Sequence, residues 1–456
     1  MNNPFTLEFK LRQHTPMIHF QHEQDGATLR ATEVKPKLDN FIMKRLMPEN
    51  LIQNDFMEHI GLNQEFIDVP KLFKRACELS KYANWQEWLV GKGKAEHVAL
   101  DYKLSIQASA IENQASGKIE KIYKNHGGYD REDPFPTFFG NMGEENNGRK
   151  EFTFYNDINV KIVSSKPGLI NEIENAISDF FMNHNFGNRQ SKGFGSFFPE
   201  DIRRFKLIPL EYSFEVDVQK PSMKRLQFVG ESPTQRFRQY QRLFEIINLF
   251  YSTLRSGINQ GWGTNPIYFK SLMFMYAKNK MNAQWDKKSI KEFFFNGILQ
   301  NHKDKYGGSD TLNFSTQKKY LMRDLLGLAS TSEWYAEYRD TITVASKGEK
   351  IERFKSPILF KPIETSSGKF KVHFTCNQKN IDSIGNKNFE ITTIKVEAKK
   401  LQLATPPEGE FVFKEFMQYA LSLDLENHIV YKSVGNTSQD ADLIKNIYNQ
   451  IRNSAR

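Results

Sequence analysis

The amino-acid sequence predicts an α+β protein that contains two units of similar construction. Apolar and polar residues alternate over 7–11, a period of two that is typical of a strand with one buried face. Over 168–184, apolar residues recur instead at the spacing of an amphipathic helix. Elements with these patterns follow the order β-α-β-β-α, which is that of a ferredoxin-like or RRM-like unit. A less regular run begins near residue 210, so we expect two ferredoxin-like (RRM-like) units with helical and loop insertions.

The first unit is predicted to span residues 1–210. Its first strand is interrupted by Pro16, and a short helix is expected to begin at Thr28 or Thr32 after a polar loop. A tract rich in Gly, Asn and Pro later in the unit is long enough to be a functional loop or a mobile insertion. The expected insertions are about 50–95 and 112–150, the middle strands are 97–110 and 151–164, and the second helix is 168–184.

The second unit is predicted to span residues 211–456. Strand-like alternation over 212–218 precedes a capping-box pattern, since Ser232-Pro233-Thr234-Gln235 places Ser at the N-cap, Pro at N1 and Gln at N3 of a helix. The stretch 257–345 is expected to form a mixed, mostly helical insertion. The remaining elements are paired strands at 358–360 and 370–374, a turn at Ser366–Gly368 that joins them, and a helix at 411–423.

Composition and charge narrow the class of protein. With 38 phenylalanines among 456 residues, the chain has ample material for a packed core. No apolar run approaches the roughly 18 residues that cross a bilayer, and the sequence after Met1 lacks the pattern of a signal peptide. Two cysteines, Cys77 and Cys376, cannot form a disulfide framework, so a cytoplasmic protein without membrane contact is expected. The net charge of +9 permits a polyanionic partner without requiring one.

The most informative motif is a Gly-rich turn (187–198) directly after the predicted second helix. Glycine permits positive φ and a close approach of the backbone to a ligand. Exposed N–H groups, with Arg189 and Lys192 beside them, would suit phosphate oxygens. Lys192-Gly193-Phe194-Gly195 is not a Walker A loop but matches the first half of an RRM RNP1 string, from which Ser196 departs. The alternative interpretation is a surface turn with incidental charge.

Together with the elements around it, this turn resembles the Gly-rich loop of the RAMP superfamily, the RNA-binding subunits of CRISPR effector complexes. The stretch 11–20, which contains Thr15-Pro16, looks like the first strand of that family, and 27–38 looks like its basic first helix. Family members often have Arg-Gly in that helix, where this chain has Arg30-Ala31. The stretch 354–360 is most similar to a strand entry in the first subunit of the Cmr-type (type III) complex, which has two ferredoxin-like halves.

The resemblance implies a non-catalytic RNA-binding subunit of a type III CRISPR-Cas ribonucleoprotein effector in antiviral defence. Such a subunit would hold guide RNA, or the duplex of guide and target RNA, beside other effector subunits of the superfamily. Its contacts would go to the RNA backbone and would not read sequence. The candidate RNA-binding residues are Arg189, Lys192, Gly193, Phe194, Gly195, Arg30, Lys35 and Lys37.

Two alternatives remain open from the sequence. Some members of the superfamily cut RNA, and by resemblance either His19, as a guide-processing residue, or Asp25, as a target-cleaving residue, would then be catalytic. The histidines are more often ordinary strand-edge or loop residues, and one aspartate in a polar loop is ordinary too. His19 and His22 lack the second ligand pair of a zinc site, so no metal or cofactor is predicted. The other alternative is a protein-interaction scaffold whose basic surface is incidental.

Overall fold

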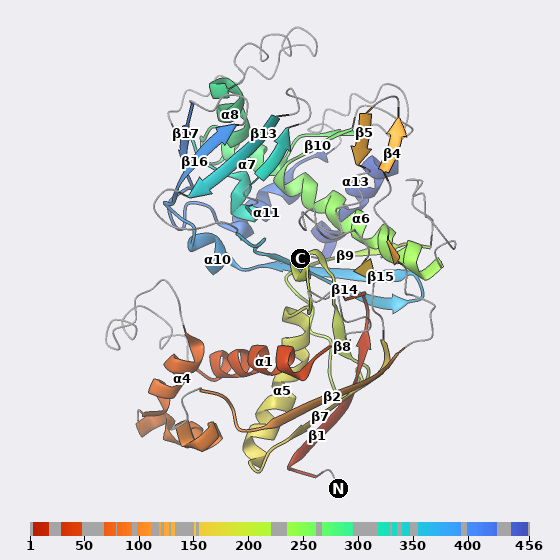
Figure 1. Ribbon diagram of the computed structural model, residues 1–456, viewed down its shortest axis with the longest axis vertical. Coiled ribbons are helices and arrows are strands. Elements are labelled where there is room, and N and C mark those ends of the chain that lie inside the picture. The colour runs from red at the N-terminus through yellow and green to blue at the C-terminus, as the bar shows by residue number, and fades with distance from the viewer. Residues whose placement is uncertain are drawn as a thin grey trace. The chain divides into compact units, whose positions relative to one another are not determined.

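The computed structural model shows a mixed α/β protein, in agreement with the predicted α+β class (Figure 1). Every sheet whose register is described is antiparallel. Among the described residues, no helix is both long and apolar enough to cross a membrane. The structure describes residues 3–17, 29–47, 68–78, 80–93, 98–110, 118–119, 123–126, 129–132, 150–151, 155–219, 235–260, 267–294, 318–328, 331–334, 340–346, 354–393, 399–425 and 439–454.

The chain divides into two compact units, each drawn from several stretches of sequence. Unit 1 consists of Met1–Leu210, Glu215–Phe244 and Phe360–His373, and unit 2 consists of Glu211–Phe214, Glu245–Leu359 and Phe374–Arg456. The sequence boundary at residue 210 stays a prediction.

A four-stranded sheet forms the centre of unit 1, with the strand order β2-β7-β1-β8. The alternation in the sequence predicts its buried face, because Leu7 and Leu11 of β1 are buried and lie opposite Ile162 and Ile158 of β7. A slip of one residue would turn these side chains to the other face, so the pattern also fixes the register. The strands are β1 (Thr6–Gln13), β2 (Lys103–Ala110), β7 (Tyr155–Val163) and β8 (Phe197–Pro199).

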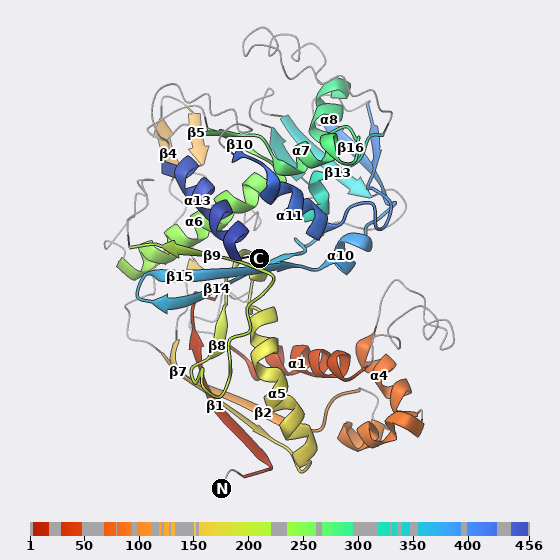
Figure 2. The same cartoon turned by 180° about the vertical axis from the view of Figure 1, so that it is seen from behind.

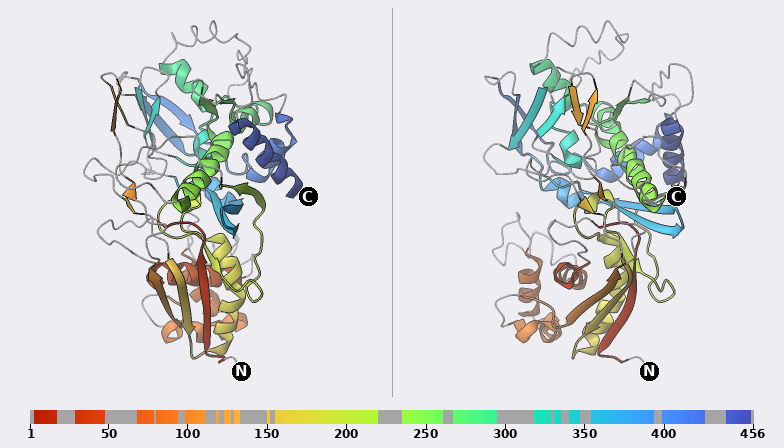
Figure 3. Two further views of the ribbon diagram at one scale, coloured as in Figure 1. Left: turned by 90° about the vertical axis from the view of Figure 1, so that its right-hand side faces the viewer. Right: turned by 45° about the vertical axis from the view of Figure 1, so that its right-hand side comes forward.

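Two helices, α1 (Ala31–Leu46) and α5 (Pro167–Asn183), cover one face of this sheet (Figure 3). Their apolar stripes supply the core, and Phe41 of α1 meets Phe180 of α5 edge to face at 5.7 Å between ring centroids. The opposite face carries charged side chains, for example Glu8, which pairs with Lys161 at 2.6 Å. Unit 1 therefore has one buried and one charged sheet face.

The two predicted insertions of unit 1 differ in content. The first holds helices, as expected, and Phe73 stacks on Trp85 there at 5.4 Å. The second was expected as a loop, but its described parts form two short antiparallel pairs, β3 with β6 and β4 with β5. The bounds are α4 (Val69–Glu78), η1 (Ser80–Trp88), η2 (Val90–Gly93), β3 (Lys118–Ile119), β4 (Tyr123–His126), β5 (Tyr129–Glu132) and β6 (Lys150–Glu151).

Elements after residue 210 include a three-stranded sheet with the order β14-β15-β9. The predicted strand pair and its turn are confirmed as β14 (Ile358–Ser366) and β15 (Lys369–Cys376), and β9 (Tyr212–Asp217) matches the predicted strand. The long helix is α6 (Gln235–Arg255), whereas the predicted cap at Ser232 lies outside the described residues. Residues of this sheet and of α6 belong to both units.

Aromatic side chains form the core of unit 2 around Phe250 of α6. The ring of Phe250 lies 5.2–5.4 Å from the rings of Phe214, Phe374 and Tyr448. Because Tyr448 belongs to α13 (Gln439–Ser454), this contact holds α13 beside α6 (Figure 2). Thr253 adds a hydrogen bond of 2.7 Å to the Tyr448 hydroxyl.

The insertion at 257–345 contains more strand than the sequence predicts. Its β13 pairs with β12 and with β16, and β16 pairs with β17. The four strands form one sheet, although β16 and β17 come much later in the sequence than β12 and β13. A strand as short as β12 has too few residues to show a period. The remaining bounds are β10 (Ile258–Gln260), β11 (Ile267–Phe269), α7 (Leu272–Asn279), α8 (Asp286–Phe294), η5 (Arg323–Leu326), β12 (Thr331–Trp334), β13 (Asp340–Ser346), α10 (Gln378–Asp382), β16 (Asn388–Thr393), β17 (Leu401–Ala404) and α11 (Phe413–Ser422).

Candidate nucleic-acid interface

The Gly-rich turn leaves α5 and enters β8 through several left-handed residues. The angle φ is positive at Gly187 (74°), Arg189 (54°), Gly193 (89°) and Gly195 (66°). The short 3-10 helix η4 (Gln190–Lys192) lies within the turn. Non-glycine residues such as Arg189 rarely adopt this backbone conformation, and those that do are concentrated at functional sites.

The end of β1 fixes the second half of the turn. The Gly195 N–H donates to the Pro16 carbonyl (2.9 Å), and the Gly195 carbonyl accepts from the Phe186 N–H (3.0 Å). The Thr15 hydroxyl donates to the Gly193 carbonyl (2.7 Å) and accepts from the Ser196 N–H (2.9 Å). These hydrogen bonds commit the backbone here to the protein itself, so the turn is a rigid element.

Packing explains two further residues of the motif. A Cβ atom on Gly195 would lie 1.9 Å from the Phe186 carbonyl oxygen, so no other residue fits without a backbone shift. The ring of Phe194 is 1% exposed and stacks on Phe244 at 3.7 Å between centroids and 6° between planes. While this stack holds, Phe194 cannot stack on a base, so Gly193, Phe194 and Gly195 would shape an RNA site rather than contact the ligand.

Arg189 and Lys192 are the partly exposed cations of the turn. Burial lowers the pKa of the Arg189 guanidinium to about 10, which still leaves it charged at neutral pH. These two side chains are therefore the residues of the motif best suited to a phosphate. Their role in RNA binding stays a prediction.

Helix α1 contacts the start of the turn through Glu33, which also holds one of the predicted cations, Lys37. Glu33 accepts from the Gly187 N–H (2.9 Å) and pairs with Lys37 (3.1 Å). The Lys37 ammonium also lies over the Phe186 ring, 4.8 Å from its centroid. The structure thus brings Lys37 together with the Gly-rich turn.

The other cations predicted on α1 lie elsewhere. Lys35 pairs with Asp39 (2.9 Å), donates to the Leu100 carbonyl (2.9 Å) and lies over the Tyr102 ring. Burial raises the pKa of Asp39 despite the charge of Lys35, and Lys35 is committed to this buried group. Arg30 is the N-cap residue of α1 and is partly exposed.

The residues predicted for the cutting alternative, His19 and Asp25, lie outside the described residues. The described histidine of that segment, His14, is buried, and burial together with the charge of Arg12 holds its pKa well below the usual value. Its Nδ1 accepts from the Glu364 N–H at 3.0 Å, which places its remaining proton on Nε2 when the ring is neutral. Within the part of the chain that the structure describes, no group of three or more His, Cys, Asp and Glu is arranged to hold a metal.

Sequence reasoning missed two buried ionisable residues of β14, Lys361 and Glu364, of which Lys361 supports the turn. Lys361 is fully buried and donates to the carbonyls of His184 (2.9 Å) and Phe197 (2.9 Å), one before the turn and one at its end. Burial holds the pKa of Lys361 well below its usual value, and a neutral amine keeps enough N–H donors for both bonds. Glu364 is also buried. A lysine and a glutamate among the apolar residues of 358–364 are the signal that could have identified them.

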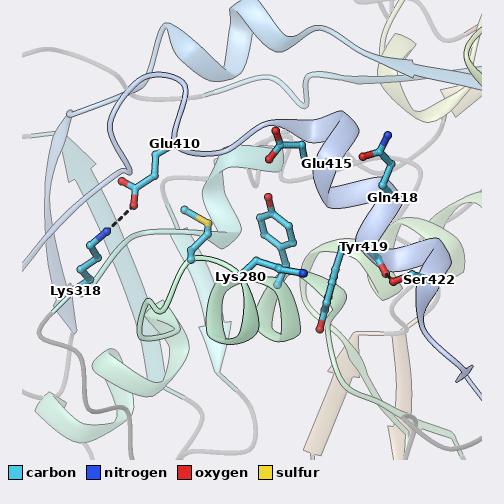
Figure 4. A pocket seen from close by; sticks show the side chains of 9 residues that line it. Lys280, Lys318, Glu410, Glu415, Gln418, Tyr419 and Ser422 are labelled. Atoms are coloured by element: carbon cyan, nitrogen blue, oxygen red, sulfur yellow. Dashed lines mark hydrogen bonds and ion pairs between the residues drawn. The ribbon is translucent and has the colours of Figure 1, made fainter.

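Unit 2 has a pocket of about 580 Å³ between α7, α11 and the chain that precedes α11 (Figure 4). Lys318 and Glu410 form an ion pair of 3.0 Å at its edge, and Lys280 lies near the Tyr419 ring. Since two lysines in the lining are matched by two glutamates, the pocket does not favour a polyanion. Its lining residues are Tyr276, Lys280, Met281, Lys318, Glu410, Glu415, Gln418, Tyr419 and Ser422.

Two models of known protein families match most of the chain. The model of the Cmr1 N-terminal domain matches residues 4–258, and that of the Cmr1 C-terminal domain matches residues 268–448. The chain belongs to the Cmr1 family. It is a Cmr1-type subunit of a type III CRISPR complex, which confirms the resemblance to the first subunit of the Cmr-type complex. No curated protein matches the sequence. In this Cmr1-family chain, the Gly-rich turn lies within the N-terminal domain match.

Proposed function

We propose that this Cmr1-family chain binds guide RNA, or the guide–target duplex, through backbone phosphates and does not cut it. The observation that carries this proposal is the rigid Gly-rich turn, which is held by hydrogen bonds from Thr15 after β1, Glu33 of α1 and Lys361 of β14. A turn fixed in this way presents Arg189 and Lys192 at little further entropic cost, which favours binding of a ligand with regularly placed anions. The chain would act in the cytoplasm beside other effector subunits.

The finer fold assignment supports the same proposal. In unit 1, once the inserted elements are set aside, the element order β1-α1-β2-β7-α5-β8 and the strand order β2-β7-β1-β8 correspond to a ferredoxin-like unit. After residue 210, the order β9-α6-β14-β15 with the strand order β14-β15-β9 has the corresponding arrangement for three strands. We infer two ferredoxin-like units, the second with a large insertion between α6 and β14.

A binding titration at several salt concentrations tests the RNA-binding function. Fluorescence anisotropy of the full chain with a labelled single-stranded RNA should show affinity that falls as salt rises, with a slope of roughly −0.7 in log–log terms for each phosphate contacted. Binding that is the same at low and physiological salt would exclude a phosphate-tracking surface. No binding at any salt concentration would favour the protein-interaction scaffold.

A cleavage assay tests the non-catalytic part of the proposal. The purified chain should leave labelled RNA intact with and without magnesium or manganese. Cleavage that disappears in His19→Ala or Asp25→Ala would assign the chain to the RNA-cutting alternative, because those residues would then act as base or metal ligand.

A further inference from the structure

We propose that Arg12 and Arg236 form a second phosphate site for the RNA backbone, which the buried carboxylate of Glu364 orients. This inference rests on the proposed RNA-binding function. From the sequence, Arg236 at the start of the long helix could line an RNA groove or merely solvate a helix face, but its pairing with Arg12 through Glu364 was not predicted. All three residues belong to unit 1. Arg12 lies in β1, Arg236 in the first turn of α6 and Glu364 in β14.

One carboxylate holds both guanidinium groups. Glu364 Oε2 accepts from Arg12 Nη2 at 3.0 Å and from Arg236 Nη2 at 2.6 Å, while Oε1 accepts from Arg236 Nη1. Because the two Nη2 atoms share one acceptor, the two guanidinium groups lie side by side in a fixed arrangement. Two guanidiniums and one carboxylate leave a net charge of +1 at this position, which favours an anion.

The exposure of the three side chains differs in the way that a binding site requires. The Glu364 side chain is 2% exposed, whereas that of Arg12 is 48% exposed and that of Arg236 is 25% exposed. Glu364 is thus inaccessible to a ligand, but the guanidinium of Arg12 reaches solvent. A guanidinium has five N–H donors, so Arg12 keeps donors for a phosphate while Nη2 bonds to Glu364.

The surroundings keep Glu364 ionised and in place. Burial alone would raise the pKa of its carboxyl, but the hydrogen bond from Arg236 and the charges of Arg236 and Arg12 lower it below the usual value. The Gly368 N–H donates to Oε1 (3.3 Å), and the Glu364 N–H donates to the ring of His14. Arg236 also lies over the Tyr240 ring, 4.7 Å from its centroid. The carboxylate is therefore a fixed anchor, and a fixed donor pair loses less entropy on binding than two mobile side chains.

The same strands support this arginine pair and the Gly-rich turn. The Ser196 hydroxyl donates to the Pro362 carbonyl (2.7 Å), two residues before Glu364 in β14. His14 directly follows β1 and is two residues after Arg12, and its N–H donates to the Ser196 carbonyl (2.8 Å). The two groups of cations are consequently built on one rigid frame within unit 1.

The alternative to a phosphate site is a group of ion pairs that only stabilises the fold. The variant Glu364→Gln distinguishes these two interpretations. This change removes a negative charge, so general electrostatics predicts equal or tighter RNA binding. If Glu364 orients the arginines, the same change should weaken binding by about three- to tenfold, because each arginine loses its charged anchor. The assay is fluorescence anisotropy of the full chain with a labelled single-stranded RNA, with a thermal melt of each variant.

Arg12→Ala and a matched control complete the test and do not depend on Glu364→Gln folding. Lys10 lies two residues earlier on the same strand and face, is 52% exposed and pairs with the exposed Asp157 at 3.2 Å. Lys10→Ala therefore removes the same charge from the same strand, and it should change affinity by less than about twofold, as expected for one exposed cation. Arg12→Ala should weaken binding by about three- to tenfold, because it removes charge-assisted bonds to phosphate.

The outcomes separate this site from the proposed function. If the parent chain binds RNA and Arg189→Ala/Lys192→Ala weakens that binding, but Arg12→Ala behaves like Lys10→Ala, the arginine pair is only structural. Folded Glu364→Gln that binds as tightly as the parent, or more tightly, also overturns the site. A parent chain that binds no RNA overturns both the proposed function and this site.

Discussion

Replacement of Gly195 by alanine should destabilise unit 1 strongly. The residue has φ of +66°, a region that costs an L residue roughly 1–2 kcal/mol. In addition, the new Cβ would lie 1.9 Å from the Phe186 carbonyl oxygen and 2.8 Å from its carbonyl carbon. Phe186 cannot shift freely, since it is fully buried and its ring lies 5.9 Å from those of Phe181 and Phe197. Forcing such a shift in a packed core costs about 1–3 kcal/mol, so the total loss should be about 2–5 kcal/mol.

A thermal melt followed by circular dichroism measures this loss, and Gly91→Ala is the matched control. Gly91 has φ of +57°, but nothing lies within 4 Å of its Cβ position. The control therefore carries the backbone cost without the clash. At roughly 2–4 °C per kcal/mol for a unit of this size, Gly195→Ala should melt about 4–20 °C below the parent and clearly below Gly91→Ala. If the two variants melt within a degree or two of each other, the close contact between Gly195 and Phe186 is not a constraint on the fold.

Three further perturbations test other parts of the structure. Arg189→Ala/Lys192→Ala should weaken RNA binding by about ten- to a hundredfold in an anisotropy titration, because two cations are lost, and it should melt like the parent; unchanged affinity would remove the turn from the site. Phe194→Ala should lower stability by about 3–5 kcal/mol in a denaturant titration, because the stack on Phe244 is lost, and a variant as stable as the parent would contradict that role. Burial raises the pKa of Asp286 from 3.8 to about 6, so its proton is held more tightly in the folded chain, and its contribution to stability falls as pH rises from about 4 to about 6. Between these pH values the free energy of unfolding of the parent should therefore fall by on the order of 3 kcal/mol more than that of Asp286→Asn, as measured by denaturant titrations at several pH values. Equal pH dependence of the two proteins would refute this role of Asp286.

The sequence was sufficient to predict an element where its structure depends on residues close together in the chain. Alternation around Leu7 and Leu11 identifies β1 and its buried face, and the spacing around Ile173 identifies α5, because both elements have one apolar side. The Gly-rich turn could be located because glycine is the residue that most readily adopts positive φ, and the glycines of the turn do have positive φ.

The sequence was insufficient where partners are distant. Glu364 is 352 residues from Arg12, and no local pattern indicates that a strand of one segment meets the other. Phe194 reads as part of an RNP1-like string, but only the position of Phe244 on α6 shows that its ring is buried. Two strands within 257–345 were missed because their sheet is completed from outside that stretch: β12 pairs with β13, and β13 pairs with β16.

The two bonds of Lys361 have a consequence for the order in which the protein is made. His184 and Phe197 mark the two ends of the Gly-rich turn, and the side chain that joins them comes from 177 and 164 residues later in the chain. A ribosome that has released only the first 210 residues has therefore not yet synthesised the group that closes this loop. Because domains generally fold from the N-terminus during synthesis, we expect the sheet of unit 1 to form first and the turn to be completed when β14 arrives. The surface with which we expect the chain to hold RNA is thus among the last parts of unit 1 to be completed on the nascent polypeptide.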